Sequence, residues 1–381
     1  MIEEKRIMRK TVFMRSIAAL SGIAMLASVA ACGDNVATDN GSNSDEAAKL
    51  SGEFAGAGAS SQQAAVDAWI SGFQSSHSGV NIAYNPTGSG AGVSSFMTGA
   101  LAWAGSDKAL SDDEVAQSKD AACADGTTAF DVPVYISPIA VVFNLKGVSD
   151  AGKHVNMDAS TIAKVFDGKI TKWNDPAIAD QNPDLKLPDT AITVVHRSDK
   201  SGTTQNFVSY FKDVAANDWP YDLSENWPNE VGQGAKGTSG VISTVKQADG
   251  TIGYAGFSQV GDLGTVAVKV GEKYTEISAE AGSKVVEDSE LDTSVTGENR
   301  VVVKLNHNTE ADGAYPIVLV SYDIACPAYK DASTAEFVKE WLTYVTSDEG
   351  QQAAQSAAGT APLPSSLSEK VAASIKAIKT K

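Results

Sequence analysis

The sequence predicts an α/β protein with largely parallel sheets and two domains. Stretches that alternate like strands are followed by Gly/Ser-rich turns and then by apolar residues at helical spacing, and this order recurs along the chain. Strands that alternate with helices favour parallel pairing, because the helices serve as crossovers. About 330 residues remain after an N-terminal leader, which is enough for two hydrophobic cores.

The first 31 residues are expected to be a secretory signal rather than part of the fold. A basic stretch precedes an apolar run, 17–31, that is too short for a comfortable membrane span and ends in small residues. Cys32 follows directly, which is the acceptor pattern of a bacterial lipoprotein. We expect cleavage before Cys32 and acylation of that cysteine; a plain signal peptide or an uncleaved anchor are the alternatives. Residues 32–50, rich in Gly, Asn, Ser and Asp, should form a flexible tether.

The charge balance excludes one class of partner. The chain has net charge −17, and its signal segment contributes five basic and two acidic residues, so residues 32–381 carry −20. Nucleic-acid binding needs clustered Lys and Arg, and we therefore expect no nucleic-acid partner. Such a chain also repels anions at long range, so any anion site must act through local donors.

Cysteine and histidine content limits the chemistry further. Once Cys32 is assigned to lipid, Cys123 and Cys326 remain. An even pair in an exported chain favours a disulfide, and two buried thiols are the alternative. We expect no metal and no cofactor, because the histidines are scattered without a pair at ligand spacing. They are His77, His154, His196 and His307.

The first half of the chain supplies two strand–turn–helix units. "GAGASS", 56–61, leads into apolar residues at helical spacing: Val66, Trp69, Ile70 and Phe73. "VNIAY", 80–84, alternates like a strand. The turn "NPTGSGAG", 85–92, then leads into a second helical set: Val93, Phe96, Met97, Ala100 and Leu101.

The second half repeats the plan. "AITVVH", 191–196, is predicted to be a strand, and helical spacing follows it at Phe207, Tyr210, Phe211 and Val214. "GQGAKGTSG", 232–240, is not a nucleotide phosphate loop, because its lysine precedes the glycine; we interpret it as the entry to a helix. "TAEFVKEWLTYV", 334–345, is predicted to be a helix with one face in the core.

Two longer apolar runs, 132–145 and 315–326, are expected to be long β segments near a domain crossover. We therefore predict one lobe made of 51–145 and 313–381, and a second lobe made of the inserted block 146–312. The acidic run 286–300 has few apolar residues and is expected to be a solvent loop.

Three turns share one plan: a short strand, a Gly/Ser turn and an amphipathic helix. They are 58–61, 88–90 and 201–203. The first N–H groups of a helix have no internal partner and carry partial positive charge, so such turns can receive an anion. Ser and Thr are also ordinary N-caps, and each turn alone is therefore weak evidence.

Two charged residues make an anion site more specific. Arg197 has a planar fork suited to a tetrahedral oxyanion, and Asp199 could hold it in place; a surface Arg–Asp pair is the alternative. Asp107, in "WAGSDKALSDDE", should repel an anion unless the ligand brings a proton. Phosphate is protonated near neutral pH and sulfate is not, so Asp107 could admit phosphate and reject sulfate. A helix cap or a pair with Lys108 is the alternative for this residue.

Seven motifs occur in a fixed order: "GAGASS", "PTGSGAGV", "GSDKALSD", "VFDGKITKWNDPAI", "HRSDKSGTT", "IGY" and "APLP". From Ser51 to the C-terminus the chain resembles the phosphate-binding lipoproteins of Pst-type bacterial ABC importers. The resemblance implies a two-lobed periplasmic-binding-protein fold of type II, whose cleft closes over one dehydrated phosphate. It also implies a lipid-anchored monomer on the extracytoplasmic face of the cell membrane. That monomer would deliver inorganic phosphate to a membrane permease, with the cytoplasmic ATPase acting indirectly.

The resemblance further implies which residues bind phosphate. They are Ser60, Ser61, Ser89, Asp107, Arg197, Ser201, Gly202 and Thr203, with Asp199 behind Arg197. The family often has Thr-Phe where Ser60 and Ser61 stand, so Ser61 keeps a backbone donor but has no aromatic ring. Lys200 replaces a common glycine and adds a charge near the mouth of the site.

Other functions fit the residues less well. A hydrolase needs triad geometry, whereas His196, Asp199 and Ser201 are close only in sequence and lie in no G-x-S-x-G turn. A binding protein for sulfate or molybdate would avoid a carboxylate in its site. A surface adhesin or signalling receptor with the same fold remains an alternative. We expect binding without catalysis.

Overall fold

The structure is a computed structural model that describes residues 50–149 and 154–380. Residue contacts separate the chain into two units, 1–47 and 48–381. The predicted signal segment, Cys32 and nearly all of the tether lie outside the described residues. Within the described ranges, no helix combines the length and the apolar character that a membrane crossing needs.

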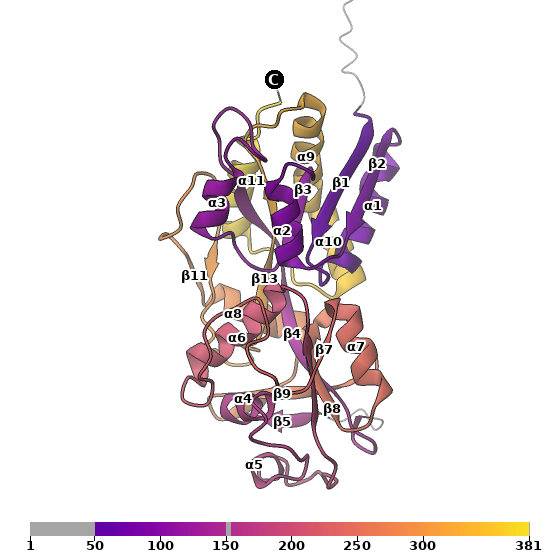
Figure 1. The fold of residues 1–381 in the computed structure, drawn as a ribbon, viewed down its shortest axis with the longest axis vertical. Coiled ribbons are helices and arrows are strands. Elements are labelled where there is room, and N and C mark those ends of the chain that lie inside the picture. Colours follow the sequence, from indigo (N-terminus) through magenta and orange to yellow (C-terminus); the bar gives the residue numbers. More distant parts are fainter. Residues whose placement is uncertain (1–49, 150–153, 381) are drawn as a thin grey trace, which may run out of the picture. The chain divides into compact units, whose positions relative to one another are not determined.

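Strands and helices alternate through the unit 48–381 (Figure 1). Its strands are β1 (Gly52–Gly58), β2 (Val80–Asn85), β3 (Trp103–Ser106), β4 (Phe130–Asn144), β5 (Val155–Met157), β6 (Thr193–Arg197), β7 (Gln233–Ala235), β8 (Thr251–Gly256), β9 (Gly264–Val270), β10 (Lys273–Thr275), β11 (Glu290–Leu291), β12 (Val303–Lys304) and β13 (Val318–Ala325). Its helices are α1 (Gln63–Ser76), α2 (Ser89–Met97), α3 (Asp112–Ser118), α4 (Ala159–Phe166), α5 (Pro176–Ala179), α6 (Gly202–Val214), α7 (Gly237–Gln247), the 3₁₀ helix η2 (Phe257–Gln259), α8 (Ala279–Glu287), α9 (Ala332–Val345), α10 (Asp348–Ala358) and α11 (Ser365–Lys376).

Eleven of the strands form one continuous ladder in the order β2-β1-β3-β13-β4-β8-β6-β7, with β9 also paired to β4 and carrying β5 and β10. Strands β11 and β12 pair with each other in a separate two-stranded sheet. Strand β4 changes partner along its length, because residues 130–138 pair with β13 and residues 139–144 pair with β8. We call β1, β2, β3, β13 and residues 130–138 the upper sheet. The lower sheet comprises residues 139–144 with β5 to β10. The names follow Figure 1.

The sheets are mixed rather than largely parallel, which corrects the prediction from sequence. Pairs such as β1 with β2 and β6 with β8 are parallel, whereas β4 runs antiparallel to β13, β8 and β9. Long unbroken apolar runs are typical of parallel strands covered on both faces. Here the run is antiparallel but equally covered, since every residue of β4 except Asn144 is buried.

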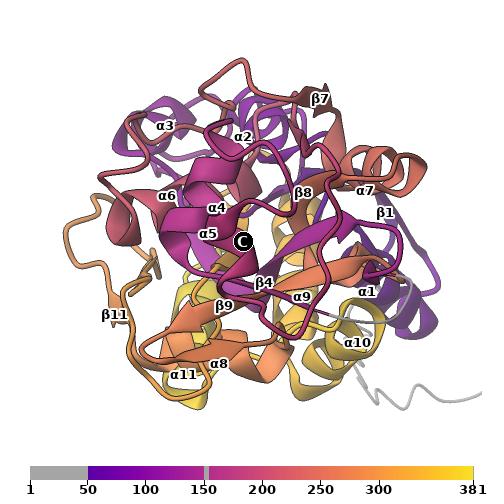
Figure 2. The same cartoon turned by 90° about the horizontal axis from the view of Figure 1, so that it is seen from below.

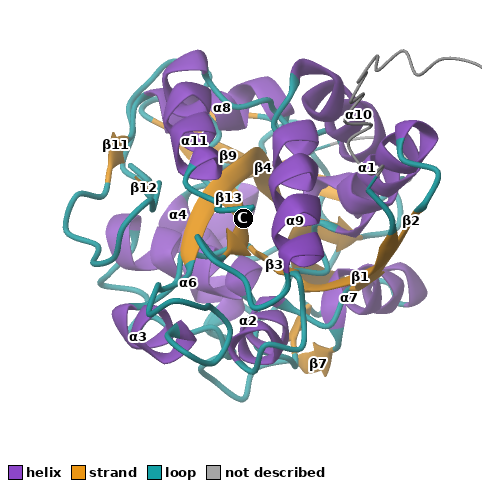
Figure 3. Ribbon diagram, turned by 90° about the horizontal axis from the view of Figure 1, so that it is seen from above, coloured by secondary structure: helices purple, strands orange, loops and turns teal. Residues whose placement is uncertain are grey.

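Helices surround the strands when the unit is seen from either end (Figures 2 and 3). In the upper sheet, Trp69 of α1 packs against Trp341 of α9 with ring centroids 6.4 Å apart. In the lower sheet, Phe207 of α6 stacks on Tyr254 of β8 at 4.5 Å. Burying one such ring stabilises the folded state by roughly 1.5–3 kcal/mol. These aromatic contacts hold in place the helices whose first turns form the site.

Three predicted boundaries need adjustment. Helix α2 ends at Met97, because Gly99 takes a left-handed φ of 76° and places Ala100 and Leu101 outside the helix. The apolar run 315–326 gives a strand only over Val318–Ala325. The acidic run 286–300 is not simply a solvent loop, since it includes the end of α8 and β11. Apolar spacing cannot predict the residues, distant along the chain, that hold this run in place.

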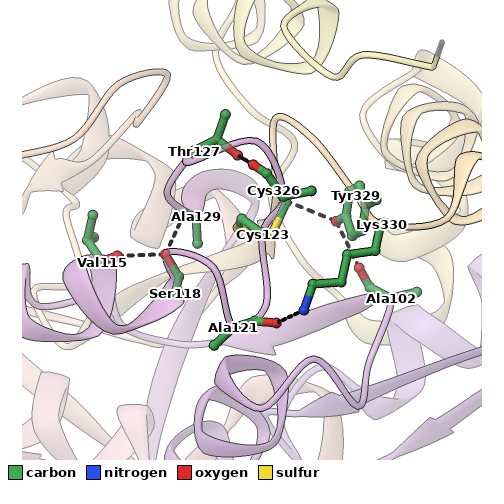
Figure 4. The surroundings of a disulfide bond; sticks show 11 residues. Ala102, Val115, Ser118, Ala121, Cys123, Thr127, Ala129, Cys326, Tyr329 and Lys330 are labelled. Carbon is green, nitrogen blue, oxygen red and sulfur yellow. Dashed lines mark hydrogen bonds between the residues drawn. A yellow bond between two sulfur atoms is a disulfide. The ribbon is translucent and has the colours of Figure 1, made fainter.

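A disulfide joins Cys123 to Cys326 across 203 residues, with the two Cα atoms 5.3 Å apart (Figure 4). It ties the segment after α3 to the end of β13. The Tyr329 hydroxyl accepts from Cys326 N at 3.0 Å and donates to Ala102 O at 2.9 Å, which anchors the same corner. Such a link stabilises the fold mainly by restricting the unfolded chain.

Candidate anion-binding site

Strand ends and helix starts bring the predicted residues together where the upper and lower sheets meet. The upper sheet contributes Ser60 and Ser61 after β1, Ser89 at the start of α2, and Asp107 after β3. The lower sheet contributes Arg197 at the end of β6 and the first turn of α6, 201–203. Each of the serine, threonine and charged side chains in this set is at most 5% exposed.

Hydroxyl groups surround the carboxylate of Asp107. Ser61 Oγ donates to Oδ2, and Thr203 Oγ1 donates to the same oxygen at 2.6 Å. Ser321 Oγ donates to Oδ1 at 2.8 Å. These donors are neutral, so the carboxylate is hydrogen-bonded without being bound to a cation, and its donors can turn to another acceptor.

Neither of the two alternatives for Asp107 is present. Lys108 Nζ lies 2.7 Å from Glu114 Oε2 instead of pairing with its neighbour. The cap of α3 is Ser111, whose hydroxyl accepts from Glu114 N in a capping box. Asp107 is therefore free of both structural duties.

The first turn of α6 approaches Asp107 closely. Asn206 Nδ2 donates to Asp107 O at 2.6 Å and to Gly202 O at 2.9 Å. A Cβ atom on Gly202 would lie 2.9 Å from the Asp107 carbonyl carbon, which real side chains do not tolerate. Glycine is thus required here for the helix of one sheet to reach the loop of the other.

Arg197 and Asp199 form a bidentate pair inside the protein. Arg197 Nε lies 2.7 Å from Asp199 Oδ1, and Nη2 lies 2.6 Å from Oδ2. The two side chains are 3% and 13% exposed, so this is not a surface pair. Burial acts to raise the pKa of Asp199, but hydrogen bonds and charge from Arg197 hold that pKa below its usual value.

Arg197 keeps donor capacity. Among the described residues, no hydrogen bond uses its Nη1. An arginine presents five N–H donors, and Asp199 takes only those of Nε and one of Nη2. The guanidinium can therefore bind a second anion without releasing the first.

Two glycines let α2 approach the turn that carries Arg197. Gly88 has a φ of 99°, and a Cβ there would lie 2.5 Å from Asp199 Oδ2. A Cβ on Gly90 would lie 2.5 Å from the Cβ of Lys200, whose side chain is exposed. The N-terminus of α2 is thus packed directly against the opposite turn, where its free N–H groups and partial positive charge are available.

Sequence reasoning missed a fourth turn. Thr238, in the first turn of α7, donates its backbone N–H to Ser60 Oγ at 3.0 Å, and the two hydroxyl oxygens are 3.1 Å apart. Gly237 N donates to Asp199 Oδ1 at 3.0 Å. The segment "GQGAKGTSG" has the same strand–turn–helix pattern as the three predicted turns. That pattern could therefore have identified the fourth turn. For Ser321, within a continuous apolar run, the sequence offers no such signal.

The arrangement does not assemble a hydrolase triad. His196 Nδ1 lies 3.0 Å from Arg197 O, and its ring stacks on Trp227 at 5.1 Å. Ser201 Oγ accepts from Thr204 N at 3.1 Å, as a helix cap. In the part of the chain that the structure describes, no three His, Cys, Asp or Glu side chains gather as a metal site would require.

Comparisons with known proteins find relatives over most of the chain. A family model described as "PBP superfamily domain" matches residues 43–349. The phosphate-binding protein PstS2 of Mycobacterium bovis (strain BCG / Pasteur 1173P2) is 35% identical over 339 residues, which cover 86% of this chain and 87% of that protein. The phosphate-binding protein PstS 3 of Mycobacterium leprae (strain TN) is 34% identical over 329 residues, 84% and 85% of the two chains.

A solved structure shares the fold. It is a high affinity periplasmic phosphate-binding protein (PfluDING) bound with phosphate, and it is 20% identical with a TM-score of 0.67. The match covers 84% of this chain and 93% of that one. The prediction of a periplasmic-binding-protein fold is confirmed.

Proposed function

Because the chain belongs to the PBP superfamily and, within it, to the PstS family of phosphate-binding proteins, we propose that it captures inorganic phosphate in this site and delivers it to an ABC permease. The observation that carries the proposal is the environment of Asp107, a buried carboxylate whose hydrogen-bond donors are hydroxyl groups. Such a group accepts a proton from a ligand, and phosphate carries one near neutral pH.

Binding would exchange hydrogen bonds that already exist. Ser61 and Thr203 would turn their hydroxyls from Asp107 to phosphate oxygens, and the phosphate hydroxyl would donate to Asp107 Oδ2 in their place. The N-termini of α2 and α6 and the free Nη1 of Arg197 would balance the ligand's charge. Sulfate has no proton to donate, so it would meet the carboxylate as a like charge.

Both sides of the site are needed for this function. The proposed lobes, 51–145 with 313–381 and 146–312, each contribute donors. They are linked by the bond from Thr203 to Asp107 and by that between Ser60 and Thr238. A ligand that contacts both lobes lowers the free energy of the closed state relative to the open one.

In this function the chain is an extracytoplasmic binding protein anchored by lipid at Cys32, and it works as a monomer. Its partners are phosphate, the permease and, indirectly, the cytoplasmic ATPase. It binds and releases its ligand without catalysis and without a cofactor.

Isothermal titration calorimetry of the phosphate-free protein tests the function. We expect phosphate and arsenate to bind and sulfate to bind at least about 100-fold more weakly, because an unprotonated dianion faces the buried charge of Asp107. Asp107→Asn should raise the affinity for sulfate relative to phosphate at least about tenfold. A wild-type protein that binds no phosphate, or a variant with an unchanged affinity ratio, would contradict the proposal.

A further inference from the structure

Two polar side chains outside the predicted turns form a chain of hydrogen bonds that ends at Asp107. Ser321, in β13, donates to Asp107 Oδ1 at 2.8 Å. Gln62, just before α1, donates from Nε2 to Ser321 Oγ at 2.8 Å. Both residues have no exposed surface. They form a short relay from an amide, through a hydroxyl, to the carboxylate.

The groups around Gln62 fix the direction of the hydrogen bonds in this relay. Gln62 Nε2 also contacts Tyr322 O at 3.1 Å, and a backbone carbonyl can only accept. Tyr84 donates its hydroxyl to Gln62 Oε1 at 3.4 Å and to Ala59 O at 2.9 Å, which orients the amide further. Ser321 therefore accepts from the amide nitrogen, and its own proton is directed to Asp107.

We propose that Gln62 and Ser321 are positioning residues that set the anion selectivity of the site. They hold Asp107 Oδ1 in a hydrogen bond and leave Oδ2 as the atom that takes the ligand's proton. This inference rests on the proposed function. It adds that the selectivity of Asp107 depends on a hydroxyl outside the ligand-binding turns.

The two oxygens of Asp107 have different surroundings. The donors to Oδ2, Ser61 and Thr203, lie in turns that face the ligand position and can turn to it. The donor to Oδ1 lies in β13 and is held by Gln62. When phosphate binds, Ser321 is thus the hydroxyl that stays on Asp107. A carboxylate that keeps this donor stays fixed in place, so its charge continues to face any unprotonated anion that enters.

Other charged and titratable groups near Asp107 also affect how the competition between the two anions depends on pH. Burial raises the pKa of Tyr84 and of Tyr135 well above their usual value, so both stay neutral between pH 5 and 8. Arg197 and Lys108 keep their partners Asp199 and Glu114. Burial raises the pKa of Asp323 to about 7. Asp323 thus titrates between pH 5 and 8, and every variant below retains its side chain. Gln62 Nε2 lies 3.5 Å from Asp323 Oδ1 and acts to lower the pKa of Asp323, so Gln62→Met changes this contribution whereas Ser321→Ala leaves that contact in place.

Competition between sulfate and phosphate from pH 5 to 8 tests the relay. Sulfate stays unprotonated throughout, so its binding reports the state of the site rather than of the ligand. With Ser321→Ala, we expect phosphate affinity at pH 8 to fall about fivefold, as for one lost hydrogen bond. We also expect the ratio of sulfate affinity to phosphate affinity to rise about fivefold, because without the Ser321 donor the carboxylate of Asp107 is no longer held with Oδ2 toward the ligand.

Three further variants separate positioning from general packing. Ser321→Thr keeps the hydroxyl and should restore both the phosphate affinity and the wild-type ratio of sulfate affinity to phosphate affinity. Gln62→Met removes the amide at similar size and should raise the ratio in the same direction by less. Ser137→Ala is the matched control, because Ser137 is buried in the neighbouring strand β4 and donates to Pro138 O at 3.2 Å. It should leave the profile unchanged.

The outcomes distinguish this inference from the function on which it rests. A wild type without phosphate binding overturns the proposed function. A Ser321→Ala protein that binds phosphate with the wild-type sulfate profile overturns the relay alone. If that variant does not fold, an unchanged sulfate profile in Gln62→Met overturns the relay instead.

Discussion

Two buried Arg–Asp pairs in this molecule have nearly the same geometry and different surroundings. Arg197 contacts Asp199 through Nε at 2.7 Å and Nη2 at 2.6 Å. Arg300 contacts Asp131 through the same two nitrogens, at 2.7 and 2.9 Å. Both guanidinium groups are at most 3% exposed.

The difference lies in the donors that remain. Arg300 Nη1 donates to Thr296 O at 2.9 Å and Nη2 to Leu110 O at 2.6 Å, while Asp131 also accepts from Leu110 N at 2.6 Å. For Arg197, no described residue takes a hydrogen bond from Nη1. The pair of Arg300 therefore fastens two loops to β4, whereas Arg197 is oriented by its carboxylate and still able to bind an anion.

A bidentate arginine is thus not a functional signal by itself. Charge is desolvated in both places, and the cost is offset by the partner carboxylate. An arginine is a structural tie when all its guanidinium nitrogens donate to other residues of the protein, and it can bind a ligand when one of them remains free. Substitutions of the two arginines test this distinction, and a buried carboxylate without an arginine provides a comparison.

Removing the saturated arginine should have the largest effect. Arg300→Met leaves the carboxylate of Asp131 buried without its cation, so we expect a loss of about 3–5 kcal/mol in the free energy of unfolding. Urea denaturation monitored by circular dichroism measures it. The double variant with Asp131→Asn should recover part of the loss, and the folded single variant should keep its phosphate affinity. A loss below about 1 kcal/mol would mean that the pair is not a structural tie.

A third buried carboxylate, Asp323, has no arginine and should make stability depend on pH. Burial raises its pKa to about 7, so the folded state holds a proton that the unfolded chain releases near pH 4. Its contribution is present below about pH 4 and is lost as the pH rises to about 7, by at most about 4 kcal/mol. Urea midpoints of the wild type and Asp323→Asn, in phosphate-free buffers, should diverge over this range in favour of the variant. Parallel curves would contradict the raised pKa.

Removing the unsaturated arginine should weaken phosphate binding. Arg197→Ala takes a charged donor from the ligand and leaves Asp199 without its cation, so we expect phosphate affinity to fall about 100-fold by calorimetry. Lys200→Ala is the matched control, because that lysine lies in the same turn but is exposed. It should change the affinity less than about twofold. Equal losses for the two variants would show that Arg197 acts only through the general field.

Much of the fold could be predicted because its signals are local. Apolar spacing placed the cores of α1 and α9 correctly and that of α6 except for Val214, which is exposed. Gly/Ser turns marked where strands pass into helices. The direction of β4 and β13 could not be read in this way, because an apolar run that is covered on both faces looks the same in either orientation. The acidic run 286–300 is a loop only from residue 292 onward, and its tie to the fold could not be predicted for a similar reason, since Arg300 depends on a partner 169 residues away.

The sequence by itself determined the order of the strand–turn–helix units, the chemical types in the four turns and the family to which the chain belongs. Each of these follows from neighbouring residues or from motifs in a fixed order. Only the tertiary structure decided that Thr238, Ser321 and Gln62 join the site, and that Arg197 keeps free donors while Arg300 does not. Hydrogen bonds form between atoms that the fold brings within about 3 Å, and distance along the chain does not encode that proximity.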